Sequence, residues 1–182
     1  MDLTGFFNLG VVLDLRNEIL IEVMENGIMP IRAHNDDGGF DLFFPNVVSI
    51  PPMNDRYSKL DKIGMKVKIL LPLGWTGFIR PRSSAYLNRL DVNGTIDRYT
   101  GEIHLTVHNE ATCTFVADRG HAIAQLIPVF TGAGLCKDDL TIDDVLTLLT
   151  ATNKIRQVDK LPETSRGDKG YGSTGNNMER KT

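Results

Sequence analysis

The segment 166–175 brings together residue types that bind phosphate groups. They are Arg166, Tyr171, Gly172, Ser173 and Thr174. A guanidinium fits phosphate oxygens with two hydrogen bonds, glycines let backbone N–H groups approach a ligand closely, and hydroxyls add donors. The tyrosine ring can cover what is bound. The pattern predicts a phosphate-binding loop with an aromatic lid, while its Gly-rich composition is also typical of a polar tail that binds nothing.

A second set of anion-binding side chains follows the apolar run 75–78. Arg80, Arg82, Ser83 and Ser84 lie where this expected strand gives way to a loop. Arginines and serines at a strand end supply charge-assisted and hydroxyl hydrogen bonds to an anion. Arginines at such places are also often solvated or ion-paired. A phosphate contact and a plain surface role therefore both stay open.

A carboxylate at a tight turn is the third candidate. Asp97 follows the apolar Ile96 between Gly94 and Gly101, and the chain then enters another expected strand. A carboxylate whose direction is fixed by hydrogen bonds can act as a general base toward water. Aspartate is also a common turn residue, so this position needs other groups beside it to be catalytic.

Short strands are the elements that must position these groups. Between residues 19 and 129, Gly, Pro, Asn or Asp interrupts the chain roughly every 8 to 15 residues, with runs rich in Val, Ile, Leu and Thr between the interruptions. The clearest runs are 19–23, 65–71 and 103–108, and the last two mostly alternate apolar and polar residues. This spacing predicts an all-β sandwich or barrel of short antiparallel strands.

One short helix is expected at 141–151, because a cluster of Leu and Val there follows several aspartates, which suit the positive end of a helix. After Pro162 the chain has few large apolar residues, so this tail alone cannot offset the entropy lost on ordering. We therefore expect an N-terminal extension at 1–16, a β-barrel domain at 17–163 with a helical insertion at about 138–152, and a mobile C-terminal arm at 164–182.

Composition limits the classes of function. With 182 residues, of which 41% are hydrophobic and 24% charged, the chain is sized for one domain. A net charge of −3 argues against a nucleic-acid partner. Cys113 and Cys136 form no C-x-x-C pair, which favours a reducing, cytoplasmic compartment. The sequence shows neither a secretory signal nor an apolar run of membrane-spanning length, so we expect no membrane partner and no secretion.

Five blocks of the sequence resemble, in order and approximate spacing, the five motifs of the trimeric dUTP diphosphatase family. They lie at 29–42, 81–84, 94–103, 120–127 and 166–175. One block alone would be weak evidence, but five in the same order argue against chance agreement. The resemblance covers most of the chain, and the added segments suit a viral or phage member of the family.

This resemblance implies an all-β, jelly-roll-like distorted β-barrel subunit, three copies of which form sites at their interfaces. The tail of one subunit would close over a site built by the others. The implied reaction is hydrolysis of dUTP to dUMP and pyrophosphate, in which Asp97 activates the water that attacks the α-phosphorus. Mg²⁺ would be held mainly by the substrate phosphates and steadied through its waters by Asp41.

The resemblance also implies the substrate contacts. The phosphate chain would be held by Arg82, Ser83, Ser84, Gln125, Arg166, Gly172, Ser173 and Thr174. Tyr99 would pack under the deoxyribose and leave no room for a 2′-hydroxyl, while Tyr171 would stack on uracil. Asn93 and Gly94 lie in the hairpin that would read the edge of the uracil.

Some features depart from the family or leave alternatives open. Arg98 leads directly into Tyr99, which makes the third motif one residue shorter than usual. A dCTP deaminase shares the fold and the Arg-Ser-Ser block, but Thr106 stands where its catalytic Glu would lie. Another alternative is a regulatory protein that keeps the fold to bind a partner protein. A zinc site at His104 and His108 lacks further ligands nearby.

Overall fold

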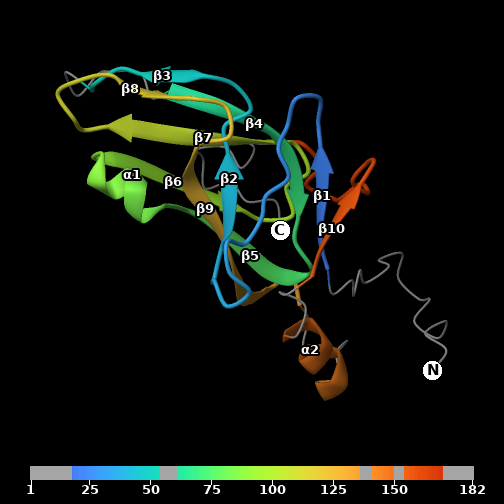
Figure 1. Cartoon of the computed structure of the whole chain (residues 1–182). Coiled ribbons are helices and arrows are strands. Elements are labelled where there is room, and N and C mark those ends of the chain that lie inside the picture. Colours follow the sequence, from blue (N-terminus) through green and yellow to red (C-terminus); the bar gives the residue numbers. More distant parts are fainter. Residues whose placement is uncertain (1–17, 54–60, 136–140, 150–153, 170–182) are drawn as a thin grey trace, which may run out of the picture.

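The computed structural model describes residues 18–53, 61–135, 141–149 and 154–169. Within these ranges the chain is built mainly of strands (Figure 1). The strands are β1 (Ile19–Val23), β2 (Phe40–Phe43), β3 (Val48–Ile50), β4 (Asp61–Leu70), β5 (Gly74–Pro81), β6 (Leu90–Ile96), β7 (Glu102–Asn109), β8 (Phe115–Ala117), β9 (Ala122–Ala133) and β10 (Ile155–Val158). The helices are α1 (Ser83–Leu87) and α2 (Ile142–Leu149).

Most of the strands belong to one curled sheet. Its order is β10-β1-β4-β7-β6-β5-β9-β2, and β3 pairs with β8 in a separate two-stranded sheet. Figure 1 shows the larger sheet curving around the body of the molecule instead of lying flat, as strongly twisted strands do. The prediction of an all-β, jelly-roll-like fold is confirmed.

The hydrophobic core explains the alternation seen in the sequence. In β7 the buried residues Ile103, Leu105 and Val107 alternate with more exposed ones, and Leu90 and Val92 of β6 are buried in the same core. Each such side chain contributes about 1.5–3 kcal/mol through burial. The three runs singled out in the sequence correspond to β1, β4 and β7, so those strand predictions are confirmed.

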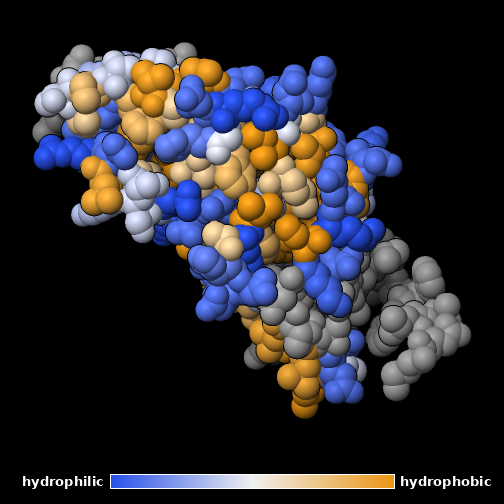
Figure 2. Space-filling view, in the orientation of Figure 1, coloured by the Kyte–Doolittle hydropathy of each residue, from blue (hydrophilic) through white to orange (hydrophobic). Residues whose placement is uncertain are grey.

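Helix α2 begins where the sequence predicts a helix. Thr141 Oγ1 accepts a hydrogen bond from the Asp144 N–H at 3.2 Å, and Asp144 Oδ2 accepts one from the Thr141 N–H at 2.8 Å, which is a reciprocal N-terminal cap. Ile142, Leu146 and Leu149 are exposed, and Figure 2 shows hydrophobic residues at the surface of this helix. Neither helix in the described parts of the chain is long and apolar enough to span a membrane.

Two expectations about the elements were wrong. The described residues contain a second helix, α1, so Ser83 and Ser84 lie in a helical turn and not in a loop. Five residues are too few for a 3.6-residue apolar period to be visible in the sequence. β10 pairs with β1 in parallel, with Ile19 opposite Ile155, whereas we expected antiparallel strands. A parallel pair cannot be joined by a tight hairpin, and in the described parts of the chain eight strands and both helices lie between β1 and β10.

Glu22 of β1 connects three parts of the chain. Its Oε1 accepts a hydrogen bond from Lys68 Nζ at 2.7 Å, and its Oε2 accepts one from the Leu161 N–H at 2.9 Å. Burial raises the pKa of Glu22, but these hydrogen bonds and the charges of Lys68 and Lys160 outweigh it, so the pKa lies below its ordinary value of 4.5.

Because the folded pKa is lower than the unfolded one, the Glu22 carboxylate stabilises the fold above pH 4.5, and this contribution disappears as the pH falls through the folded pKa. Glu22→Gln should therefore lower the free energy of unfolding by about 1–2 kcal/mol at pH 7. The difference from wild type should shrink in acid. Urea unfolding at several pH values measures both effects. Glu25→Gln removes the same charge at an exposed position and should change little; a Glu22→Gln deficit independent of pH would contradict this account.

Candidate functional site

Five of the residues singled out in the sequence line one cavity. It encloses about 360 Å³, and its lining includes Asp41, Arg82, Ser83, Ser84 and Gln125. Strand register brings them together, because Asp41 of β2 lies opposite Gln125 of β9, and Ala124 of β9 lies opposite Pro81 at the end of β5. Three segments that are far apart in the sequence therefore meet at one place.

An ion pair joins two walls of this cavity. Arg82 Nε lies 2.9 Å from Asp41 Oδ1, and the two side chains are 37% and 15% exposed. The Arg82 N–H donates to the Ile123 carbonyl at 2.8 Å, and Nη1 donates to the Ala122 carbonyl at 3.3 Å. The guanidinium is thus fixed in direction while part of it stays accessible, as a group that meets an incoming anion must be.

The Asp41 carboxyl has an unusual electrostatic setting. Burial raises its pKa above the ordinary value of 3.8; Arg82 opposes this shift, and the negative charge of Asp37 adds to it. The net pKa shift is upward. A carboxylate that is costly to ionise gains from any further cation placed beside it.

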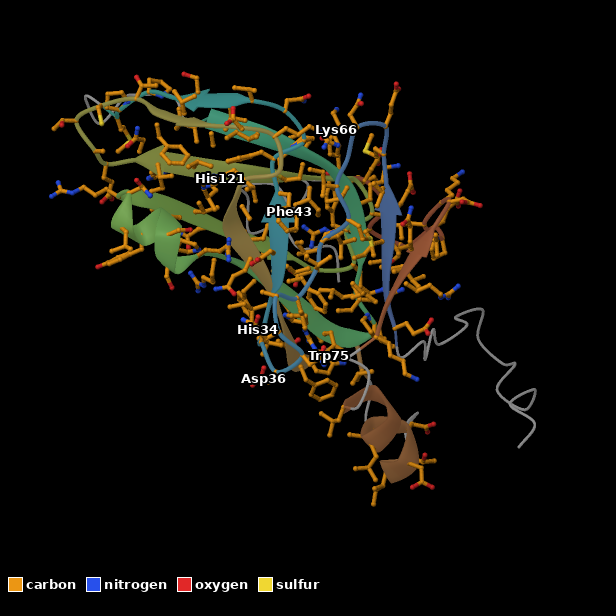
Figure 3. All side chains as sticks on the ribbon, in the orientation of Figure 1. His34, Asp36, Phe43, Lys66, Trp75 and His121 are labelled. Carbon is orange, nitrogen blue, oxygen red and sulfur yellow. The ribbon has the colours of Figure 1, made fainter. Side chains whose placement is uncertain are left out.

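The loop before β2 forms the remaining wall, and the sequence analysis did not single out its side chains. Ala33, His34, Asp37, Gly38 and Gly39 line the same cavity. Figure 3 labels His34 and Asp36 in this loop, at the end of β2 away from Phe43. A Cβ on Gly39 would lie 2.8 Å from Gln125 Oε1, so a glycine here lets the loop approach β9. The sequence signal that could have indicated this loop is Asp36 and Asp37 followed by Gly38 and Gly39.

Asp97 lies directly after β6, and its side chain is 51% exposed. The next residue, Arg98, has a φ of 45°, a left-handed conformation that few non-glycine residues adopt. This conformation turns the chain sharply just before Tyr99. The Arg166 Nη1 atom lies 3.5 Å from Asp97 Oδ2 and donates to the Asp97 carbonyl at 3.2 Å.

A single chain does not bring Asp97 to the cavity. In the β5–β6 hairpin Gly77 lies opposite Ile96, so Asp97 lies at the beginning of β5 whereas Arg82 follows its end. Arg82 lies five positions beyond Gly77, which is about 16 Å at the rise of a strand. Asp97 and the cavity therefore lie at opposite ends of the hairpin.

Contacts at both the ring and the hydroxyl fix the Tyr99 side chain. Its ring packs against the main hydrophobic core, and its hydroxyl donates to the Glu102 carbonyl at 3.2 Å. A Cβ on Gly101 would overlap with the Tyr99 hydroxyl oxygen and Cζ, so glycine is needed there. The Tyr99 ring thus has a fixed position next to the Asp97 turn.

Asn93 and Gly94 lie in the middle of β6 and do not line the cavity. Asn93 Oδ1 accepts a hydrogen bond from Arg80 at 2.7 Å, and its Nδ2 donates to Asp91 Oδ2 at 2.7 Å. Gly94 lies opposite Ile79 of β5. Arg80 therefore contacts the neighbouring strand and not the group of residues around Arg82.

The expected arm is described only in part. Arg166 lies within the described residues, beside Asp97. The other predicted ligand-binding residues of the arm, Tyr171, Gly172, Ser173 and Thr174, lie outside the described residues, as does the extension at 1–16. Their predicted roles stay predictions.

Metal ligands are sparse in the described ranges. No group of three or more His, Cys, Asp or Glu side chains there is arranged to hold a metal ion. His104, considered for zinc, has its Nδ1 atom 2.9 Å from the Glu102 carbonyl. A cation at Asp41 would take most of its ligands from water and from a bound anion, which is how Mg²⁺ commonly binds beside phosphates.

Comparison with known proteins identifies a family whose members are similar to this chain. A family model described as dUTPase matches residues 25–138. The chain is 35% identical over 164 residues to the deoxyuridine 5′-triphosphate nucleotidohydrolase of Clostridium novyi, an alignment that covers 87% of this chain and 99% of that protein.

Solved structures agree with the fold. The EIAV dUTPase is similar with a TM-score of 0.55 and 28% identity, over 68% of this chain and 99% of that chain. The Staphylococcus bacteriophage 80alpha dUTPase, solved with dUPNHPP, has a TM-score of 0.56 and 22% identity, over 87% of this chain and 99% of that chain. The similarity to the bacteriophage dUTPase shows a shared fold.

The contact between Gly101 and Tyr99 yields a stability prediction. Gly101→Ala should lower the free energy of unfolding by about 1–3 kcal/mol, because the new methyl group displaces the Tyr99 ring from its place on the core. Urea unfolding measures the effect. In a Tyr99→Leu background the same substitution should cost less, since the clashing atoms are gone. Gly38→Ala is a control, because a Cβ on Gly38 would meet nothing within 4 Å; equal costs in both Tyr99 backgrounds would count against the clash.

Proposed function

Because the chain belongs to the dUTPase family, we propose that it hydrolyses dUTP to dUMP and pyrophosphate. The observation that carries the proposal is the cavity in which Arg82, Ser83, Ser84 and Gln125 converge beside Asp41. A fixed guanidinium, two hydroxyls and an amide are donors suited to the oxygens of a triphosphate.

In the proposed reaction Asp97 orients a water molecule and accepts its proton. The water oxygen bonds to the α-phosphorus, the bond from that phosphorus to the oxygen bridging to the β-phosphate breaks, and pyrophosphate leaves with that oxygen. Hydrolysis of this kind depends chiefly on positioning the reactants and neutralising charge. The fixed position of Arg82 and its partial exposure support a role in both.

The cation fits this arrangement through Asp41. Its carboxylate is largely buried, borders the cavity and would face the waters around Mg²⁺ bound to the phosphates. When bound, Mg²⁺ neutralises phosphate charge and aligns the phosphate chain. Arg82 would then contact both Asp41 and a phosphate oxygen, which fixes the position of the carboxylate relative to the phosphate.

The choice of nucleoside is assigned to other residues. Tyr99, held on the core beside the Asp97 turn, would pack under the deoxyribose and exclude a 2′-hydroxyl. Asn93 and Gly94 would read the uracil edge, and Tyr171 would stack on the base. Arg166, Gly172, Ser173 and Thr174 would hold the γ-phosphate end.

The hairpin geometry supports sites shared between copies of the chain. A base must lie within hydrogen-bond reach of its water, about 2.6–3.2 Å, while the water oxygen lies about 3–3.5 Å from the phosphorus. The register places Asp97 about 16 Å along the strand from Arg82, so a phosphate held by Arg82 needs Asp97 from another copy. A contact between unlike surfaces of identical chains can close into a ring, and the family resemblance suggests three copies.

A cytoplasmic location and a viral or phage origin belong to the same proposal.

Replacing the proposed base tests the reaction. Asp97→Asn should lower kcat for dUTP by about a thousandfold, because the amide cannot accept the proton. Release of pyrophosphate with Mg²⁺ present measures the rate, and dCTP, dTTP and UTP serve as competing substrates. Ammonia release from dCTP would favour a deaminase. A rate unchanged by the substitution would instead favour a protein that keeps the fold to bind a regulatory partner.

Mixing two inactive variants tests the shared site. Asp97→Asn and Arg82→Ala homo-oligomers should each be nearly inactive, but co-refolding them at equal amounts should restore activity. Random assembly would pair an intact Arg82 with an intact Asp97 in about a quarter of the sites. Sedimentation should show a trimer. If mixing restores nothing, the two residues act from the same chain.

A further inference from the structure

Arg80 has the residue type of an anion-binding group but takes no part in the proposed reaction. It lies near the end of β5, opposite Gln125 of β9, with its side chain exposed. On the other side of β5, the preceding residue Ile79 lies opposite Gly94 of β6. The next residue of β6 in this register is Asn93. Residues opposite each other in antiparallel strands project from the same face of the sheet, so Arg80 lies between Gln125 and Asn93 on one exposed face.

Hydrogen bonds fix both ends of the Asn93 side-chain amide. Arg80 Nη1 donates to Asn93 Oδ1 at 2.7 Å, and Asn93 Nδ2 donates to Asp91 Oδ2 at 2.7 Å. A guanidinium can only donate hydrogen bonds, and a carboxylate can only accept them. A flipped amide would place its NH₂ group against the guanidinium and its oxygen against the carboxylate. These two partners therefore allow only one orientation of the amide.

The rest of the Asn93 amide is open to a ligand. Asn93 is exposed, whereas Val92 and Ile96 of the same strand are buried. An amide oxygen can accept two hydrogen bonds, and an amide nitrogen can donate two. Because Arg80 and Asp91 use one of each, one acceptor position and one donor position remain for a bound molecule.

The remaining acceptor and donor match uracil. The edge of uracil carries an N3–H donor beside a carbonyl acceptor, whereas the same edge of cytosine carries an N3 acceptor beside an amino donor. An amide that turned freely could bind either base. A locked amide binds only uracil, since in the proposed site the deoxyribose packed on Tyr99 holds the base in place. Cytosine would meet donor against donor and acceptor against acceptor, and such unpaired polar groups oppose binding strongly.

We propose that Arg80 and Asp91 are positioning residues, which lock the Asn93 amide in the orientation that binds uracil and rejects cytosine. They act through Asn93 and do not contact the base themselves. This inference rests on the proposed function and deepens it, because it names the groups that determine the choice of base.

Removing either partner should weaken the choice of base. Arg80→Met keeps the length of the side chain but cannot donate, and Asp91→Asn keeps the shape but can both donate and accept. Each should lower the ratio of kcat/KM for dUTP to kcat/KM for dCTP about tenfold, because the amide can then turn. Pyrophosphate release from each substrate with Mg²⁺ present measures the ratio. The corresponding ratio of dUTP to UTP should not change, since it reports on the sugar.

Further variants separate this role from a structural one. Arg80→Lys supplies a donor again and should restore most of the wild-type ratio. Arg156→Met removes another exposed strand arginine, which pairs with Glu18 at 2.7 Å, and should leave the ratio unchanged. In an Asn93→Ala background, Arg80→Met should have no further effect, because the amide that it positions is absent. The urea midpoint of Arg80→Met should stay close to that of wild type, since the contact is exposed.

The outcomes distinguish this inference from the function on which it rests. A wild-type ratio of dUTP to dCTP in Arg80→Met or in Asp91→Asn would refute the inference and leave dUTP hydrolysis standing. Equal losses with both substrates in Arg80→Met, or a further loss of the ratio in the Asn93→Ala background, would mean that Arg80 contacts the substrate directly, which also overturns it. If the wild-type protein released no pyrophosphate from dUTP, the proposed function would fail, and this inference with it.

Discussion

The register of the β5–β6 hairpin is the constraint on which the proposed chemistry depends. Because Gly77 lies opposite Ile96, the two ends of β5 carry different candidate groups, with Arg82 beyond one end and Asp97 beside the other. Antiparallel pairing allows no small adjustment of this separation, since a one-residue slip would turn the buried face of each strand outward. With the proposed roles of Arg82 and Asp97, a chain with this hairpin divides anion binding and base chemistry between two surfaces, each incomplete alone.

The proposed anion-binding surface depends on a second pairing, that of β9 with β2 and β5. β9 lies between β2 and β5, so it carries Gln125 next to Asp41 on one side and ends its pairing with β5 just before Arg82 on the other. The close approach at Gly39 lets the preceding loop complete the wall. Burial then sets the electrostatics, because the Asp41 carboxylate is costly to ionise there and Arg82 compensates only in part. A bound cation would complete the compensation.

Much of this could be predicted from the sequence where the signal is local. Alternation identified β4 and β7, and the cluster of aspartates before Leu and Val identified α2. Helix α1 was missed because five residues show no period. The parallel pairing of β1 with β10 was missed because partners distant in sequence leave no local pattern. Likewise, residue types indicated that Arg82 and Asp97 could do chemistry, but only the strand register shows that they lie at opposite ends of one hairpin.

The parallel β1–β10 pair also bears on the order in which the molecule assembles. Its partners, Ile19 and Ile155, lie 136 positions apart in the sequence, so closing this contact costs more chain entropy than forming any neighbouring hairpin. Such long-range pairings form slowly, and β10 is made late in synthesis. Until β10 docks, β1 is an exposed sheet edge that can pair with another chain. Docking of β10 thus covers one edge of the sheet, and failure at that step would favour association between chains.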